Sequence, residues 1–106
     1  MGQQPRRQQQ RLPNKLRVIR EFLKLGQVEM AKAIRSEILS YYDRRYNLKP
    51  GGISEYENGQ REPNLFVLIA YARLGQVHLQ SVADDRITVK EFRRLVGKEG
   101  YSKGRI

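Results

Sequence analysis

The chain has 106 residues, enough for one domain with a single modest core. Its 21 Lys and Arg outnumber its 11 Asp and Glu, and the net charge of +10 favours a polyanionic partner, either nucleic acid or an anionic membrane surface. With no cysteine and one histidine, it lacks the side chains of a disulfide framework, a thiol nucleophile or the usual zinc site. The longest apolar run, Leu65 to Ala72, is far shorter than the ~20 residues of a membrane-spanning helix. We therefore expect a soluble, cytoplasmic protein with no enzymatic activity, cofactor or metal ion.

The chain is expected to begin with a flexible arm. Residues 1–14 are rich in Gln and Arg and hold a single leucine, too little apolar surface to offset the entropy lost on ordering. Two interpretations of this arm are open. It enters a DNA minor groove beside the domain, or it only keeps the chain soluble. Its cations are Arg6, Arg7 and Arg11.

The periodicity that follows predicts two helices. Asn14 is expected to cap the first helix, and Gly26 to end it. The inward face of this helix is Leu16, Ile19, Phe22 and Leu23. A second helix is expected to begin at Gln27. Its inward face is Met30, Ala31 and Ile34. Residues 35–46 either prolong this helix or form a short helix of their own.

Turn and cap residues predict the next two helices. Pro50 suits the first turn of a helix, because its missing N–H would have no partner inside the helix. This helix is expected to stop at Asn58-Gly59, a strong turn pair. Asn64 is expected to cap the following helix, and Gly75 to close it. The expected apolar face of that helix is Leu65, Leu68, Ile69 and Ala72.

The last part of the chain predicts a short helix near residues 79–82, with His78 at a capping position, and a final element. Residues 88–96 place Val89, Phe92 and Val96 on one side of a helix, and a strand over 86–89 is the alternative. Beyond Gly97 the chain is rich in glycine and basic residues. The fold class is therefore all-α, with residues 86–106 as a C-terminal extension that ends in a basic tail.

The residues from Ile53 to Pro63, ISEYENGQREP, carry a resemblance to a known family. The chain resembles the lambda-repressor-like (Cro-type, XRE) helix-turn-helix regulators, in which an aromatic-Glu-Asn-Gly string ends the recognition helix and Arg-Glu-Pro leads into the next helix. Gln27 and Ala31 match the start and the core of the family's second helix. The resemblance runs from Leu16 to about Val82. It implies a five-helix DNA-binding domain over residues 15–85, with an insert at about 35–46.

The resemblance also implies a function, which is sequence-specific regulation of transcription on double-stranded DNA. Gln27 and Asn58 would meet DNA phosphates, with Arg61 adding affinity. The start of the recognition helix would face base edges in the major groove. The residues implied there are Lys49, Gly51, Gly52, Ser54 and Glu55.

Arg20 and Glu57 match a pair that forms a mostly buried salt bridge between the first helix and the recognition helix in this family. Family members commonly dimerise on two half-sites about one helical turn apart, so a homodimer is expected. The resemblance places such a protein in the cytoplasm of a prokaryote, as a nucleoid-associated or phage-type regulator.

Two features depart from the family pattern. The segment between the second and third helices is about 12 residues longer than the tight turn usual in this motif. A straight helix of that extra length would end about 18 Å too far away, so the insert must turn back or pack as its own element. The base-facing positions are also poor in hydrogen-bonding side chains, since Pro50, Gly51 and Gly52 offer none.

Alternatives stay open for two parts of the chain. Arg44 and Arg45, among the tyrosines of the insert, would contact phosphate, form a protein interface or cover the insert's own core. The two glycines Gly51 and Gly52 either let a helix backbone approach DNA closely or mark a frayed helix.

Two other functions are compatible with the sequence. An antitoxin or other protein-interaction module on the same fold would bind its partner through the Tyr-rich insert, with DNA binding weak or secondary. A basic RNA-binding or ribosome-associated protein is the third hypothesis, although the chain has no aromatic strand signature of RNA binding.

Overall fold

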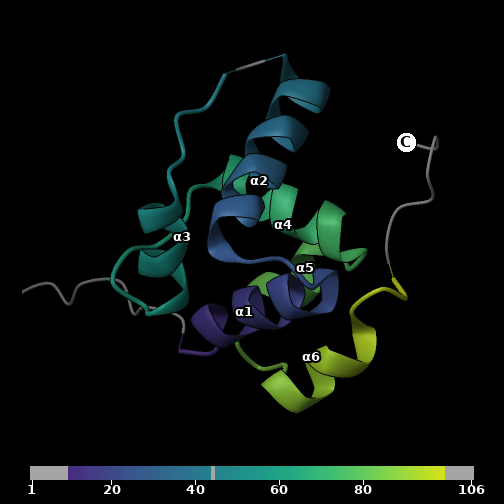
Figure 1. Ribbon diagram of the computed structural model, residues 1–106. Helices are drawn as coiled ribbons and strands as arrows, with labels where there is room; N and C mark the ends of the chain where they lie inside the picture. Colours follow the sequence, from purple (N-terminus) through teal and green to yellow (C-terminus); the bar gives the residue numbers. More distant parts are fainter. Residues whose placement is uncertain (1–9, 44, 100–106) are drawn as a thin grey trace, which may run out of the picture.

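The computed structural model describes residues 10–43 and 45–99. This part of the chain contains six α-helices and no strand, which confirms the all-α class (Figure 1). The helices are α1 (Leu12–Leu23), α2 (Gln27–Tyr42), α3 (Pro50–Glu57), α4 (Leu65–Gly75), α5 (Leu79–Ala83) and α6 (Val89–Leu95). Arg6, Arg7 and Arg44, for which DNA contacts were predicted, lie outside the described residues.

The predicted start of the first helix is wrong. α1 begins at Leu12 with Arg11 at the N-cap, so Asn14 lies inside the helix. Pro13 in the first turn has no N–H to leave unpaired, and Leu12 is buried. The Arg11 amide donates to Asp85 Oδ1 at 2.9 Å, and its guanidinium donates to the Asp85 carbonyl. Arg11 is therefore attached to the end of the domain, and residues 12–14 belong to the folded part.

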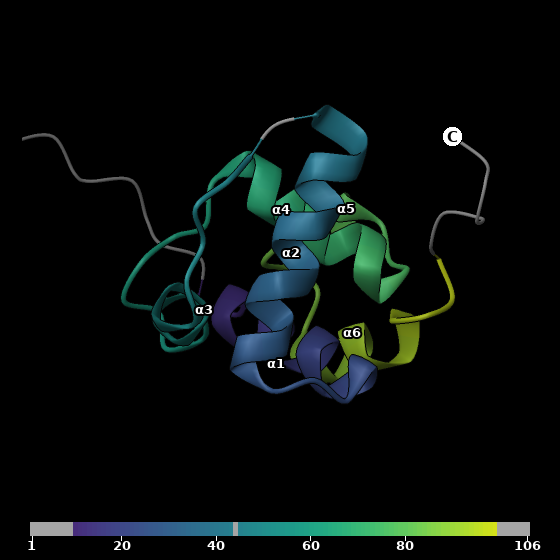
Figure 2. The ribbon, with the colours of Figure 1, turned by 45° about the horizontal axis from the view of Figure 1, so that its top comes forward.

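The insert prolongs α2, as one of the two alternatives predicted. Ile38 is buried, and the helix ends where Asp43 takes a left-handed conformation with φ 49°. Residues 45–49 run back alongside α2 to the start of α3 (Figure 2). Buried Leu48 holds this connection to the core, and Arg35 donates a hydrogen bond to the Leu48 carbonyl. The Asn64 side chain donates to the Tyr46 hydroxyl at 2.7 Å, so α4 holds the connection from its other side.

The core lies between α1, α2, α3 and α4. The predicted inward faces of α1 and α2 are buried, except that Phe22 is 48% exposed and Leu23 is half-buried. The predicted face of α4 is wrong at Leu65, which is 61% exposed. Its buried residues are Val67, Ala70, Tyr71, Ala72 and Gly75. Because α4 is apolar on nearly all sides, its periodicity could not indicate which side faces the core.

The C-terminal extension contributes to the core. α6 is capped by a reciprocal pair in which Thr88 Oγ1 accepts from the Glu91 amide and Glu91 accepts from the Thr88 amide. This cap excludes the strand predicted as the alternative over 86–89. α6 packs against α1 (Figure 1). Phe92 on α6 and Val96 after it are both buried. The fold therefore includes a sixth helix beyond the five of the implied domain.

Lys15 is fully buried in the centre of this arrangement, which the sequence reading missed. Its Nζ donates to the carbonyls of Ser81 at 2.9 Å and Asp84 at 2.8 Å, at the C-terminal end of α5. The ammonium lies 5.4 Å from the centre of the Phe92 ring. One side chain thus connects α1, α5 and α6. The signal was present, because Lys15 is three residues after buried Leu12 and four before buried Ile19.

The burial of Lys15 predicts a specific pH dependence. Loss of hydration lowers the pKa of Lys15 from its ordinary value of 10.5, against the opposing attraction of Asp85 and Asp84. Between the lowered pKa and 10.5 the unfolded chain binds more protons than the folded chain, so stability rises with pH in that window. We expect the free energy of unfolding of the wild type, relative to Lys15→Met, to increase as pH rises toward 10.5. Urea denaturation of both proteins from pH 7 upward measures this difference, and a constant difference would contradict the prediction.

Candidate nucleic-acid interface

The structure exposes the first turn of α3, where the base-facing residues were predicted. Lys49 forms the N-cap in an extended conformation, and Pro50 occupies the first turn. Lys49, Pro50 and Gly51 are exposed, and Ser54 and Glu55 are partly exposed. On its other side, α3 is anchored to α1 and α2 by its buried residues Ile53, Tyr56 and Glu57. The first turn of α3 is therefore exposed to solvent, while the opposite side of the helix packs in the core.

The two glycines of α3 have different environments. A Cβ at Gly51 would meet no atom within 4 Å, so this backbone is open to close approach. A Cβ at Gly52 would lie 2.8 Å from Leu48 Cδ1, so Gly52 lets the returning connection pack against α3. The Gly52 amide donates to the Lys49 carbonyl at 2.9 Å. The backbone is thus helical at both glycines.

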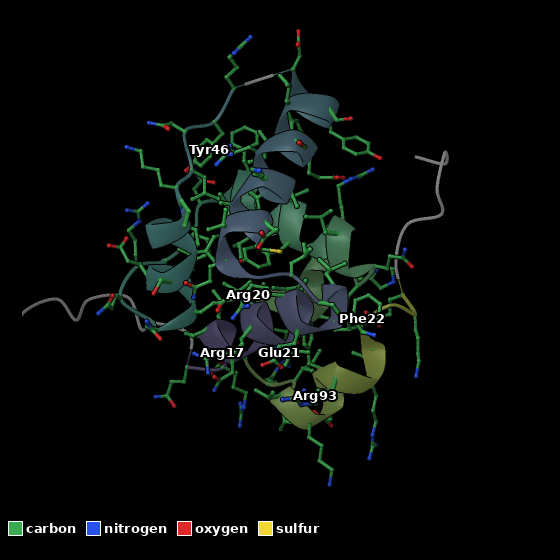
Figure 3. All side chains as sticks on the ribbon, in the orientation of Figure 1. Arg17, Arg20, Glu21, Phe22, Tyr46 and Arg93 are labelled. Atoms are coloured by element: carbon green, nitrogen blue, oxygen red, sulfur yellow. The ribbon has the colours of Figure 1, made fainter. Side chains whose placement is uncertain are left out.

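A buried ion pair attaches the end of α3 to α1. Arg20 donates through Nε to Glu57 Oε2 at 2.7 Å and through Nη2 to Oε1 at 2.9 Å, with the Glu57 side chain 2% exposed. The hydrogen bond to Glu57 raises the pKa of the Arg20 guanidinium. Arg17, which the sequence reading missed, donates to the Glu57 main-chain carbonyl at 3.2 Å. Figure 3 shows both arginines extending from α1 at the side of α3. The ion pair that the resemblance implies is present and joins α1 to α3.

Near the C-terminal end of α3, the polar side chains pair with one another. Arg61 Nη1 lies 3.1 Å from Glu55 Oε1, and the Arg61 guanidinium lies 5.4 Å from the centre of the Tyr56 ring. Asn58 is exposed and donates to Ser54 Oγ at 3.3 Å. The arrangement offsets the negative charge of Glu55 on a surface expected to meet phosphates.

Gln27 is the first residue of α2, as expected, but a carboxylate lies beside it. Glu29 Oε1 is within 2.8 Å of the position that a Cβ on Gly26, the N-cap of α2, would take. The helix dipole favours a negative group at this end, and here a side chain of the protein supplies one. A DNA phosphate at Gln27 would have to displace Glu29 or share the site with its charge.

Arg45 lines a groove between α2 and the returning connection, beside α3. The groove encloses about 390 Å³ and is here called the basic groove. Its lining residues are Lys32, Arg35, Ser36, Leu39, Arg45 and Tyr46. Lys32 and Arg35 were not singled out in the sequence, although their spacing places them on one side of α2. Only the return of residues 45–49 alongside α2 brings Arg45 to them.

No helix among residues 10–43 and 45–99 is long and apolar enough to cross a membrane. The same residues contain no cluster of three or more His, Asp or Glu side chains placed to hold a metal ion.

A comparison with protein families gives one match. A family model described as helix-turn-helix matches residues 39–82, from the last turn of α2 through α3 and α4 into α5. No curated protein and no solved structure matches the chain. The matched region contains the exposed turn of α3, the ion-paired Glu57 and the string from Tyr56 to Pro63. Residues 39–82 of this chain are therefore similar to the helix-turn-helix family, in agreement with the resemblance carried by the string from Tyr56 to Pro63.

Proposed function

We propose that this protein is a sequence-specific transcriptional regulator that inserts the first turn of α3 into the major groove of duplex DNA. The observation that carries the proposal is the exposure of Lys49, Pro50 and Gly51 on a helix whose opposite side is held in the core. The open backbone at Gly51 allows the groove wall to come close to the helix. The net charge of +10 adds attraction to phosphates.

Base reading falls to three side chains in this proposal. Lys49 donates to guanine, and Glu55 accepts from the cytosine amino group. The Ser54 hydroxyl donates to or accepts from a base edge. Because these contacts are few, DNA shape supplies part of the specificity. Asn58 and Arg61 hold phosphates at the end of α3, and Gln27 holds one at the start of α2 once Glu29 has moved aside.

Selection of binding sites from a random duplex library, followed by titration at two salt concentrations, tests the proposal. We expect enrichment of a two-fold-symmetric site whose half-sites lie about one helical turn apart, bound by a homodimer. Binding should persist at ~200 mM salt. Binding that ignores sequence and disappears as salt rises would leave only charge attraction and overturn the proposal.

A pair of variants tests the groove contact itself. Replacing Lys49 and Ser54 together by alanine should weaken binding to the selected site by ~10-fold or more, since each good base contact contributes about 1–3 kcal/mol. Lys90→Ala on α6 removes a single exposed cation outside the matched segment and should weaken binding far less. Equal affinities for the double variant and the wild type would exclude base reading by Lys49 and Ser54.

A protein-interaction role, as in an antitoxin, is the second candidate. It is favoured by four exposed apolar side chains near the end of α2 and the start of α4, which are Leu39, Tyr41, Tyr42 and Leu65. The Tyr42 ring packs edge-on against Phe66 at 5.1 Å, which keeps part of this surface in a fixed shape. Sedimentation equilibrium of the wild type and of Leu39→Ser/Leu65→Ser tests whether a second copy covers it. A dimer lost in the variant would show that a second copy covers this surface, and two monomers count against a second copy as the occupant.

A further inference from the structure

The basic groove has the volume of a small-molecule site. Its volume of about 390 Å³ lies within the range of ligand pockets in proteins, roughly 300–1,000 Å³. One wall is α2, and the other is the returning connection with Tyr46, which Figure 3 labels beside α2. A single phosphate of a DNA backbone would fill only a small part of this volume.

The charge of the groove favours a doubly charged anion. Lys32, Arg35 and Arg45 line it, and none of its described lining residues is acidic. The Arg35 guanidinium uses one N–H for the Leu48 carbonyl, and a guanidinium has five N–H donors in all. Arginine and lysine form charge-assisted hydrogen bonds to phosphate, and Ser36 adds a hydroxyl.

The other side chains that line the groove are apolar and aromatic. Leu39 is exposed along α2, and Tyr46 faces it from the connection. The Tyr46 ring is held in place because its hydroxyl accepts a hydrogen bond from Asn64 at 2.7 Å. A flat organic group between these side chains would bury apolar surface while a phosphate meets the cations.

We propose that the basic groove binds a small phosphorylated organic molecule, with its phosphate monoester on Lys32, Arg35 and Arg45 and its organic part against Leu39 and Tyr46. The ligand would lie next to the residues that hold the start of α3 in place. Arg35 holds the Leu48 carbonyl, and the Leu48 side chain packs under Gly52 of α3. Occupancy would therefore change the position of the first turn of α3 and alter DNA affinity, a consequence that rests on the proposed function.

Isothermal titration of the full chain in the absence of DNA tests the binding site. The probes are adenosine 5′-monophosphate, adenosine and inorganic phosphate. We expect the monophosphate to bind ~10-fold or more tightly than either of the other two, because only it engages the cations and the apolar wall together. Absence of binding by both the monophosphate and inorganic phosphate at millimolar concentration would overturn the proposal.

Two double variants with the same change in net charge separate a built site from diffuse attraction. Lys32→Gln/Arg45→Gln should weaken monophosphate binding by ~10-fold or more. Lys90→Gln/Arg94→Gln, on the exposed surface of α6, should leave it within about 2-fold of the wild type. Equal weakening in the two double variants would overturn the proposal.

DNA affinity of the same variants distinguishes the sources of phosphate. If no small probe binds while Lys32→Gln/Arg45→Gln loses much more DNA affinity than the control, the groove holds a backbone phosphate and the small-molecule site is excluded. If the monophosphate binds but no DNA sequence is selected, the groove proposal stands and the proposed function fails.

Discussion

Glu57→Ala should lower the free energy of unfolding by about 3–5 kcal/mol, because it leaves the Arg20 guanidinium largely buried without its charge partner. The pair makes two hydrogen bonds of 2.7 and 2.9 Å, and the Glu57 side chain is 2% exposed. Arg20 also donates to the Leu25 carbonyl at 2.9 Å, so it cannot move into solvent without breaking a second contact. Urea denaturation followed by circular dichroism measures the change.

Glu55→Ala is the matched control for this prediction. Glu55 lies on the same helix and is also paired with an arginine, but both side chains of the Arg61–Glu55 pair are about half exposed. Water screens such pairs, so the control should unfold with nearly the stability of the wild type. A Glu57→Ala protein as stable as Glu55→Ala would show that the Arg20–Glu57 pair does not hold α3 in place.

Phe92→Ala should lower the free energy of unfolding by about 3–5 kcal/mol, the usual range for removing a large buried aromatic side chain. Phe92 is fully buried between α6 and α1, and its ring lies under the Lys15 ammonium. Removing the ring leaves a cavity beside a buried cation. The measurement is again urea denaturation, with the slope of the transition checked for two-state unfolding.

Phe22→Ala provides the comparison for this second prediction. Phe22 is 48% exposed, so folding buries less of its apolar surface. The substitution should therefore lower the free energy of unfolding by about 1 kcal/mol. Equal, small losses in the two variants would show that α6 is an appendage rather than part of the core.

Elements with local signals were predictable from the sequence. Pro50 begins α3, the Asn58-Gly59 pair follows it, and the Asn64 side chain caps α4 by accepting from the Val67 amide at 3.0 Å. These positions depend on groups within a few residues of each other, so composition and spacing are sufficient. The helix-turn-helix resemblance depended on the same stretch, and the family match covers it.

The site was only partly predictable. Lys49 and Gly51 are exposed and Ser54 is partly exposed, while their contact with DNA stays a prediction, and Arg20 forms the expected ion pair with Glu57. The proximity of Arg17 to Glu57, the carboxylate of Glu29 over the start of α2 and the basic groove were missed. Each of these features depends on how the elements pack together, and residue spacing in the sequence does not indicate that packing.

By itself the sequence determined the helical class, the boundaries of α3, the N-terminal boundary of α4 and the motif, because hydrophobic period, caps and turn pairs act over one or two helical turns. Only the tertiary structure decided which side of α4 faces the core, that Lys15 is buried, and that α6 completes the core. Those outcomes depend on contacts between residues far apart in the chain, such as Lys15 with Ser81. Burial free energy is shared among all elements that pack together, so no single segment carries the information for its own partner.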